Sequence, residues 1–132
     1  MNNADHICLS FPVNPAYLSS ARLTASSVAN RIGFDIDEIE DIKTAVSEAC
    51  TYIIKRSADF ENSYFEICFM PGAGEISVEI EAKDNKEIQN VSSEEMSLMM
   101  IRALVDEFSI TKPTPDKIFI NMIKRHTETV FD

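Results

Sequence analysis

The segment that decides the fold is residues 35–57, DIDEIEDIKTAVSEACTYIIKRS. Its apolar residues recur at steps of three and four, which places them on one face of an α-helix. These residues are Ile39, Ile42, Val46, Ala49, Cys50 and Ile53. Asp35 followed three residues later by Glu38 is a variant of the capping box, which marks a helix start. The segment therefore predicts one long amphipathic helix that packs against a core.

A second set of side chains on this helix lies away from the apolar stripe: Ala45, Glu48, Tyr52 and Arg56. Glu48 and Tyr52 are four residues apart, so both point the same way. Such a helix can bury one stripe and direct a carboxylate from another towards a site. The plainer alternative is that Glu48 is simply solvated, because charged residues mostly lie on the surface.

The composition is typical of one globular domain. The chain has 132 residues, of which 45% are hydrophobic, and this is enough to bury a core. The net charge of −10 argues against nonspecific binding to nucleic acid or anionic membranes, whose phosphates would be repelled. There is no apolar run as long as a membrane span, and the N-terminus lacks signal-peptide features. We expect a single domain over 1–132, ordered at about 6–126, in a cytoplasmic protein.

The three cysteines are Cys8, Cys50 and Cys68, and no two of them have a C-x-x-C spacing. Each falls inside an expected strand or helix. We interpret all three as buried reduced thiols, in preference to disulfides or metal ligands. No metal site is expected.

Strands are predicted where apolar and polar residues alternate. The expected strands are 6–11, 64–70, 75–82 and 117–124, with a short candidate strand at 109–111. Residues 112–116 are expected to form a turn, and 126–132 a frayed tail.

Besides the helix at 35–57, helices are predicted from residue 14 to about 32, with Gly33 ending that helix, and at 94–108. The helix at 94–108 is apolar around much of its circumference, and we interpret its methionines as core-filling residues in preference to a partner surface. All elements together predict an α+β fold. It is a two-layer sandwich of a mixed, mainly antiparallel sheet with helices packed on one face.

Glycine is scarce in this chain. Its only glycines are Gly33, Gly72 and Gly74. A site that cradles phosphates with tight backbone turns needs glycines, and the second half of the chain has almost none to offer.

Four segments together resemble the anti-sigma-factor serine kinases, a family of the GHKL ATPase superfamily with the Bergerat, or histidine-kinase-like, fold. The segments are ASSVANRIGFD at 25–35, IEDIKTAVSEACT at 39–51, IRALVDEFSI at 101–110 and INMIKRH at 120–126. The resemblance covers about residues 6–126 in the same order of elements, and VSEACT in this context is its most specific part. It implies the sandwich predicted above, together with a nucleotide site.

The family's first motif is a helical Glu followed four residues later by an Asn. The Glu is the base for the substrate serine, and the Asn binds Mg²⁺. The resemblance places Glu48 at the position of the base. Tyr52 stands where the Mg²⁺ ligand belongs and cannot replace it. Arg56 stands where the family usually has His or Asn.

The second motif is Asp-x-Gly-x-Gly after a strand. Its Asp hydrogen-bonds the adenine amino group, and its glycines let the backbone approach the nucleotide. Asp84 matches the Asp, which makes it a vestigial nucleotide-binding residue. Lys86 and Ile88 replace the two glycines.

The remaining motifs are a Gly-x-Gly that binds phosphates at the start of the late helix and a Gly-Thr before the last strand. Glu95 and Ser97 stand at the first, where a carboxylate would repel a triphosphate, and Asp116-Lys117 stands at the second. Phosphoryl transfer depends on positioning of the metal and the phosphates, so these losses predict a kinase fold that has lost the kinase. Glu48 and Asp84 would then be a solvated helix carboxylate and a strand-end acid.

Three functions follow as alternatives. The first is a homodimeric regulator that binds a sigma factor or an anti-sigma-factor antagonist by partner switching, without ATP, Mg²⁺, or direct contact with nucleic acid or membrane. The second is an active serine/threonine-protein kinase that phosphorylates the antagonist, using ATP and Mg²⁺, with Glu48 as base and Asp84 for adenine. The third is a pocket for a smaller or uncharged ligand, closed by Tyr52. The lost glycines and metal ligand favour the first.

Overall fold

The structure, a computed structural model, describes residues 5–57, 62–88 and 92–127, except that the side chains of 92–95 lie outside the description. In this part of the chain five strands form one sheet in the order β1-β2-β3-β5-β4. The strands are β1 (Ile7–Pro12), β2 (Tyr64–Gly72), β3 (Glu75–Lys83), β4 (Glu107–Thr114) and β5 (Lys117–Arg125). The helical elements are η1 (Pro15–Tyr17), α1 (Leu18–Ile32), α2 (Ile36–Arg56) and α3 (Ser92–Leu104).

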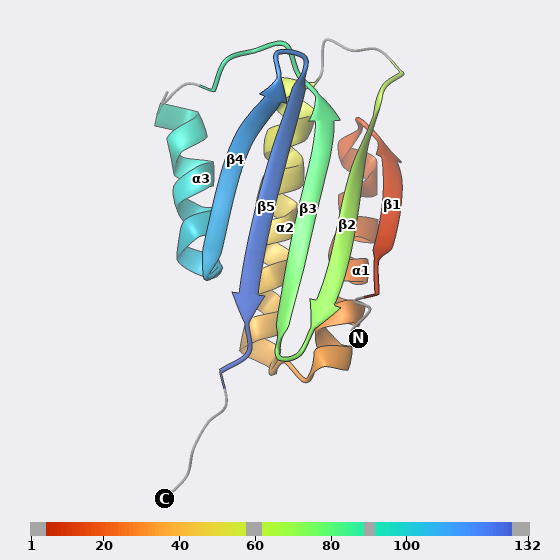
Figure 1. The fold of residues 1–132 in the computed structure, drawn as a ribbon, viewed down its shortest axis with the longest axis vertical. Coiled ribbons are helices and arrows are strands. Elements are labelled where there is room, and N and C mark those ends of the chain that lie inside the picture. The colour runs from red at the N-terminus through yellow and green to blue at the C-terminus, as the bar shows by residue number, and fades with distance from the viewer. Residues whose placement is uncertain (1–4, 58–61, 89–91, 128–132) are drawn as a thin grey trace, which may run out of the picture.

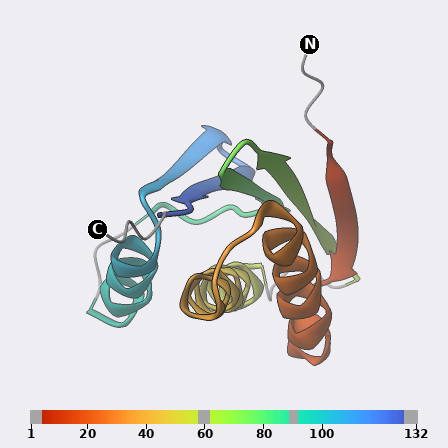
Figure 2. The same ribbon diagram turned by 90° about the horizontal axis from the view of Figure 1, so that it is seen from below.

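The three α-helices lie side by side on one face of the sheet, with α2 in the middle (Figures 1 and 2). Each of the four strand pairings is antiparallel. The expected α+β two-layer sandwich with helices on one face is thus confirmed. No helix among the described residues is both long enough and apolar enough to span a membrane.

The central helix α2 begins and ends where the sequence predicts. Asp35 Oδ1 accepts a hydrogen bond from the Glu38 N–H at 2.8 Å, and Glu38 Oε1 accepts one from the Asp35 N–H at 2.9 Å, which completes the capping box. Gly33 ends α1 with φ of 98°, a left-handed conformation that suits glycine. These two caps set the short connection between α1 and α2.

The core lies between α2 and the inner face of the sheet. The inward residues of the three central strands are fully or almost fully buried, and they alternate with outward residues that are exposed or partly exposed. They are Phe65, Ile67 and Phe69 of β2, Ile76, Val78 and Ile80 of β3, and Ile118, Ile120 and Met122 of β5. The apolar stripe of α2 covers them. The alternating residues of the strands and the stripe of the helix, which has a period of 3.6 residues, therefore form one core.

The C-terminal region differs from the prediction. Helix α3 ends at Leu104 and not at 108, β4 covers Glu107–Thr114 and not 109–111, and the expected turn at 112–116 shortens to Pro115 and Asp116. Residues such as Phe108 pair with β5, and a register shift between Thr111 and Thr114 accommodates Pro113. Pairing along β5 therefore overrides the helical periodicity that continues through 108.

The residues after β5 are also better ordered than expected. His126 Nδ1 lies 2.6 Å from Glu38 Oε1, and the Thr127 N–H donates to Glu38 Oε2 at 2.8 Å. The His126 ring stacks on Phe34 with 5.9 Å between ring centroids. The predicted frayed tail was therefore wrong for 126 and 127, and its remainder, 128–132, lies outside the described residues.

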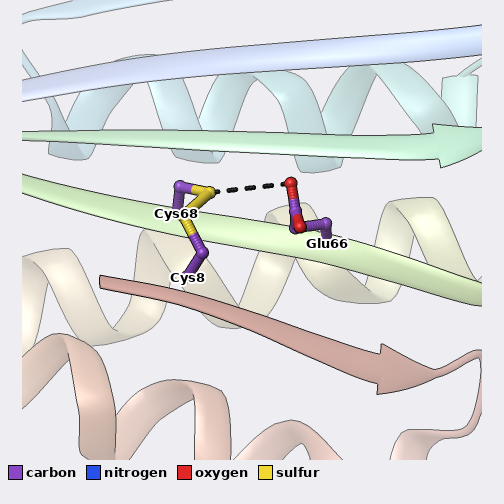
Figure 3. The surroundings of a disulfide bond; sticks show 3 residues. All are labelled: Cys8, Glu66 and Cys68. Carbon is purple, nitrogen blue, oxygen red and sulfur yellow. Dashed lines mark hydrogen bonds between the residues drawn. A yellow bond between two sulfur atoms is a disulfide. The ribbon is translucent and has the colours of Figure 1, made fainter. Parts of the chain in front are cut away.

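The cysteine prediction was wrong for two residues and confirmed for the third. Cys8 and Cys68 form a disulfide on the outer face of the sheet (Figure 3). The antiparallel register of β1 and β2 places them directly opposite each other, with Cα atoms 4.1 Å apart. This pairing joins positions 60 residues apart, which spacing in the sequence does not reveal. Cys50 is a buried free thiol, and burial raises its pKa to about 12.

The methionines of α3 were expected to fill the core, and this was also wrong. Among the described side chains of α3, Leu98 and Ile101 are the buried ones. Met96, Met99 and Met100 are exposed. The helix is apolar on two opposite sides, and only one of them faces the core.

Candidate functional site

The residues that the resemblance assigns to adenine and metal binding meet at one end of the sandwich. There the C-terminal end of α2, the end of β3 and the turn between β4 and β5 lie together (Figure 1). Ser57, the residue that ends α2, is fully buried, and its hydroxyl donates to the Lys83 carbonyl at 2.6 Å. This bond ties the end of α2 to the end of β3.

Asp84 follows β3, is fully buried and has hydrogen bonds to both carboxylate oxygens. Oδ2 accepts from Arg56 Nε at 2.8 Å and lies 2.7 Å from Arg56 Nη2. Oδ1 accepts from the Lys86 N–H at 2.9 Å. Lys112 Nζ is 3.6 Å from Oδ2. Asp84 is thus a strand-end acid, as predicted, but it forms a buried ion pair inside the protein.

Arg56 provides the positive charge of this ion pair and is only 3% exposed. Its Nη1 donates to the Tyr52 hydroxyl at 3.1 Å, and its guanidinium lies 5.4 Å from the centre of the Tyr52 ring. Its Nη2 donates to the carbonyls of Lys86 at 2.7 Å and Glu87 at 3.1 Å. The side chain therefore joins one helix turn of α2 to the loop that follows β3.

Lys112 completes the network, and sequence reasoning missed it. Its Nζ donates to the carbonyls of Asp84 at 2.7 Å, Lys86 at 2.7 Å and Pro115 at 3.0 Å. These three bonds match the three donors of an ammonium group. A signal for it was present in β4, where Phe108, Ile110 and Lys112 alternate inward, but the strand was expected to end at 111.

We call these four side chains, Tyr52, Arg56, Asp84 and Lys112, the charged cluster. Two basic groups surround one buried carboxylate, and the carbonyl oxygens of the loop after β3 accept the remaining donors. The buried carboxylate is paired with a cation and hydrogen-bonded, which is what allows its charge to be buried.

Three further predicted site residues are Glu48, Lys86 and Ile88. Glu48 lies on α2 eight residues before Arg56 and is half-buried. Ile88 is half-buried and packs against the core. Lys86 enters the cluster through its backbone, since its N–H and carbonyl both make bonds there.

The other predicted positions lie outside the charged cluster. Glu95 and Ser97 are in the first turns of α3, where Ser97 is half-buried and the Glu95 side chain is outside the described residues. Lys117 begins β5 and is half-exposed, with Nζ 3.7 Å from Glu81 Oε2. Among the described residues there is no group of three or more His, Cys, Asp or Glu that could hold a metal ion.

Comparison with known sequences identifies relatives of the whole domain. The histidine kinase-like ATPase domain family matches residues 11–124. The serine-protein kinase RsbW of Bacillus cereus (strain B4264) is 31% identical over 129 residues, which cover 83% of this chain and 79% of that protein. RsbW of Bacillus subtilis (strain 168) is 52% identical over 56 residues, 42% of this chain and 35% of that protein.

The matched segments cover only part of several of these relatives, from 35% to 65% of their length. Among solved structures, the RsbU and RsbW domains of a Mycobacterium tuberculosis protein align with a TM-score of 0.72 and 16% identity, over 92% of this chain and 32% of that one. The SiaB–SiaC complex of Pseudomonas aeruginosa aligns with a TM-score of 0.71 and 10% identity, over 89% and 88%. These two structures share the fold. From the family match and the RsbW relatives, we conclude that the chain belongs to the histidine kinase-like ATPase domain family and, within it, to the RsbW-like group.

Proposed function

We propose that this chain is a cytoplasmic partner-switching regulator that acts by binding protein partners and has no ATP-dependent kinase activity. The expected partners are a sigma factor or an anti-sigma-factor antagonist, bound by a homodimer. Its relatives are named serine-protein kinase RsbW, and one structural neighbour was solved as a complex of two proteins. The observation that carries the proposal is the buried ion pair between Arg56 and Asp84.

The first argument concerns adenine. A carboxylate that binds the adenine amino group must present an accessible oxygen lone pair to the ligand, and Asp84 is fully buried. Both oxygens of Asp84 accept hydrogen bonds from within the chain. An incoming base would have to displace the Arg56 guanidinium, and breaking a buried ion pair costs about 3–5 kcal/mol. That penalty corresponds to a loss of affinity of roughly two to four orders of magnitude.

The second argument concerns the metal and the phosphates. Tyr52 stands at the expected Mg²⁺ position, and its hydroxyl accepts from Arg56. The loop after β3 has no glycine in its described part, and its carbonyls at Lys86 and Glu87 are held by Arg56. The residues present do not fit Mg²⁺-ATP, so the regulator we propose works without it.

The experiment is calorimetric titration of the purified protein with ATP plus Mg²⁺, and with ADP. We expect no binding at millimolar nucleotide. The double variant Tyr52→Asn/Arg56→His introduces the residue types that the resemblance expects on α2 and tests whether the charged cluster is what prevents nucleotide binding. Micromolar binding by the wild type, weakened by Asp84→Asn, would overturn the proposal.

The second candidate is the active kinase, and one observation favours it. Glu48 and Asp84 are both present, and Glu48 is half-buried on the helix that reaches the charged cluster. Transfer of radiolabelled phosphate from ATP to an antagonist protein, abolished by Glu48→Ala, would establish it. The small-ligand alternative is weakened because Arg56 lies against Tyr52, where such a ligand was expected.

A further inference from the structure

Helix α3 presents an apolar face that nothing in the described chain covers. Met96, Met99 and Met100 are 72%, 65% and 49% exposed. Together with the exposed Ala103 they recur at steps of three and four, which aligns them along one side of the helix. We call these four residues the methionine face.

The methionine face is a surface and not a misplaced part of the core. The opposite side of α3 carries Leu98 and Ile101, which are 5% and 0% exposed. That side packs against α2, and α3 stands at the β4 end of the sandwich, outside the other helices (Figures 1 and 2). A helix that is apolar on two sides needs two packing partners, and the fold supplies one.

The charges decide which partner fits. The chain carries 12 basic and 22 acidic residues, a net charge of −10. The field of such a chain repels acidic partners and attracts basic ones. Arg102, the basic residue of α3, is directed over the Phe108 ring at 4.9 Å. A partner with basic residues around an apolar stripe is attracted by the same field.

We propose that the methionine face binds an amphipathic helix of a basic protein, with apolar residues against the methionines and Lys or Arg on the flanks. Methionine is unbranched and polarizable, so such a face adapts to the side chains that dock on it. The inference rests on the proposed function, since it names the kind of partner that the regulator grips. It does not depend on the nucleotide result.

The test uses the full chain with ¹³C-labelled methionine methyl groups, followed by NMR. The probe is a synthetic amphipathic helix of Leu and Lys, compared with the matching peptide of Leu and Glu. We expect the Leu/Lys peptide to shift the signals of Met96, Met99 and Met100, while the fully buried Met122 serves as an internal reference. Added salt should weaken the binding, and the Leu/Glu peptide should leave the spectrum unchanged.

Two matched variants distinguish the effect of the methionine face on peptide binding from the effect of the overall charge. Met99→Glu should lower the affinity for the Leu/Lys peptide by about tenfold or more, although it adds an attractive charge. Leu23→Glu makes the same charge change at a residue on α1 that is 67% exposed, and it should not weaken binding. Equal binding of both peptides, unchanged methionine signals, or shifts that depend on protein concentration without peptide would each overturn the proposal.

The two proposals fail in different ways. Nucleotide binding measured by calorimetry would refute the proposed function. It would not change the peptide-induced shifts that we expect for the methionines of α3. Loss of the peptide-induced shifts would refute the methionine face and leave the Arg56–Asp84 argument intact.

Discussion

At the scale of single residues, the charged cluster shows how Arg56 determines what Asp84 can bind. The resemblance places Asp84 at the position of the adenine ligand, and in the structure this residue is half of a buried ion pair with Arg56. A buried carboxylate without that partner is strongly unfavourable, since desolvation is no longer offset. Arg56 is therefore required as long as Asp84 is present.

This dependence gives a prediction about stability. Arg56→Met keeps an unbranched apolar stem but removes the guanidinium and its charge, and it should lower the free energy of unfolding by about 3–5 kcal/mol. Adding Asp84→Leu to it should restore much of that loss. Urea unfolding measures both variants.

A surface pair provides the control. Lys117→Met removes the partner of Glu81 at a distance of 3.7 Å, where both side chains are about half-exposed. This change should lower stability by less than about 1 kcal/mol. If Arg56→Met were no worse than Lys117→Met, the cluster would not be a buried ion pair in solution.

The sequence predicts half of this site. Helical spacing places Tyr52 and Arg56 on one face of α2, and Asp84 is correctly placed after a strand. The contact between them spans 28 residues and exists only because the ends of α2 and β3 lie side by side, which no local pattern encodes. Lys112 was missed for the same reason, because its inward direction depends on the pairing of β4 with β5.

At the scale of elements, local sequence patterns predict the bounds of a helix or strand where only one periodicity is present, and they fail where a helical and a strand periodicity overlap. Helix α2 and strand β3 match their predicted bounds to within one residue at each end. At the boundary of α3 and β4, a helical apolar period and a strand alternation overlap at Phe108, and pairing with β5 decides the outcome. The disulfide belongs to this scale too, because it follows from the register of β1 on β2.

The disulfide gives a prediction about the edge strand. β1 is six residues long, and several of them are exposed, so its attachment to β2 is weak without the covalent link. The bond closes a segment of 60 residues, and reduction should lower the free energy of unfolding by about 2–4 kcal/mol. Denaturant unfolding with and without reductant measures this difference.

The variant Cys8→Ser separates the disulfide from other effects of the reductant. It should have the stability of the reduced wild type, and reductant should not change it further. The buried Cys50 is present in both proteins and cancels from the comparison. If reductant did not change the unfolding midpoint of the wild type, the hydrogen-bonded pairing of β1 with β2 would be enough to hold β1 in place.

At the scale of the whole molecule, the two layers are joined by the charged cluster at one end and by Glu38 at the other. The Glu38 carboxylate accepts from the Asp35 N–H within the cap of α2, and from the Thr127 N–H just beyond β5. It also contacts His126. One side chain thus links the start of the central helix to the end of the last strand, 88 residues later.

This link predicts how stability depends on pH. Burial raises the pKa of Glu38, but the hydrogen bonds from Asp35 and Thr127 and the contact with His126 outweigh it, so the pKa lies below its usual value of 4.5. A pKa that is lower in the folded state than in the unfolded state means that ionised Glu38 stabilises the fold. That contribution is complete above pH 4.5 and is lost as the pH falls through the folded-state value.

Glu38→Gln should therefore be less stable than the wild type near neutral pH, and the difference should shrink on acidification below about pH 4.5. Urea unfolding at a series of pH values gives the free energy of unfolding of both proteins as a function of pH. The control is Glu40→Gln, which removes a carboxylate from an exposed position of the same helix. If the Glu38→Gln and wild-type curves stayed parallel down to acid pH, the carboxylate would not be what holds the end of β5 to α2. His126 and its stacking on Phe34 would then have to hold that end of the sandwich.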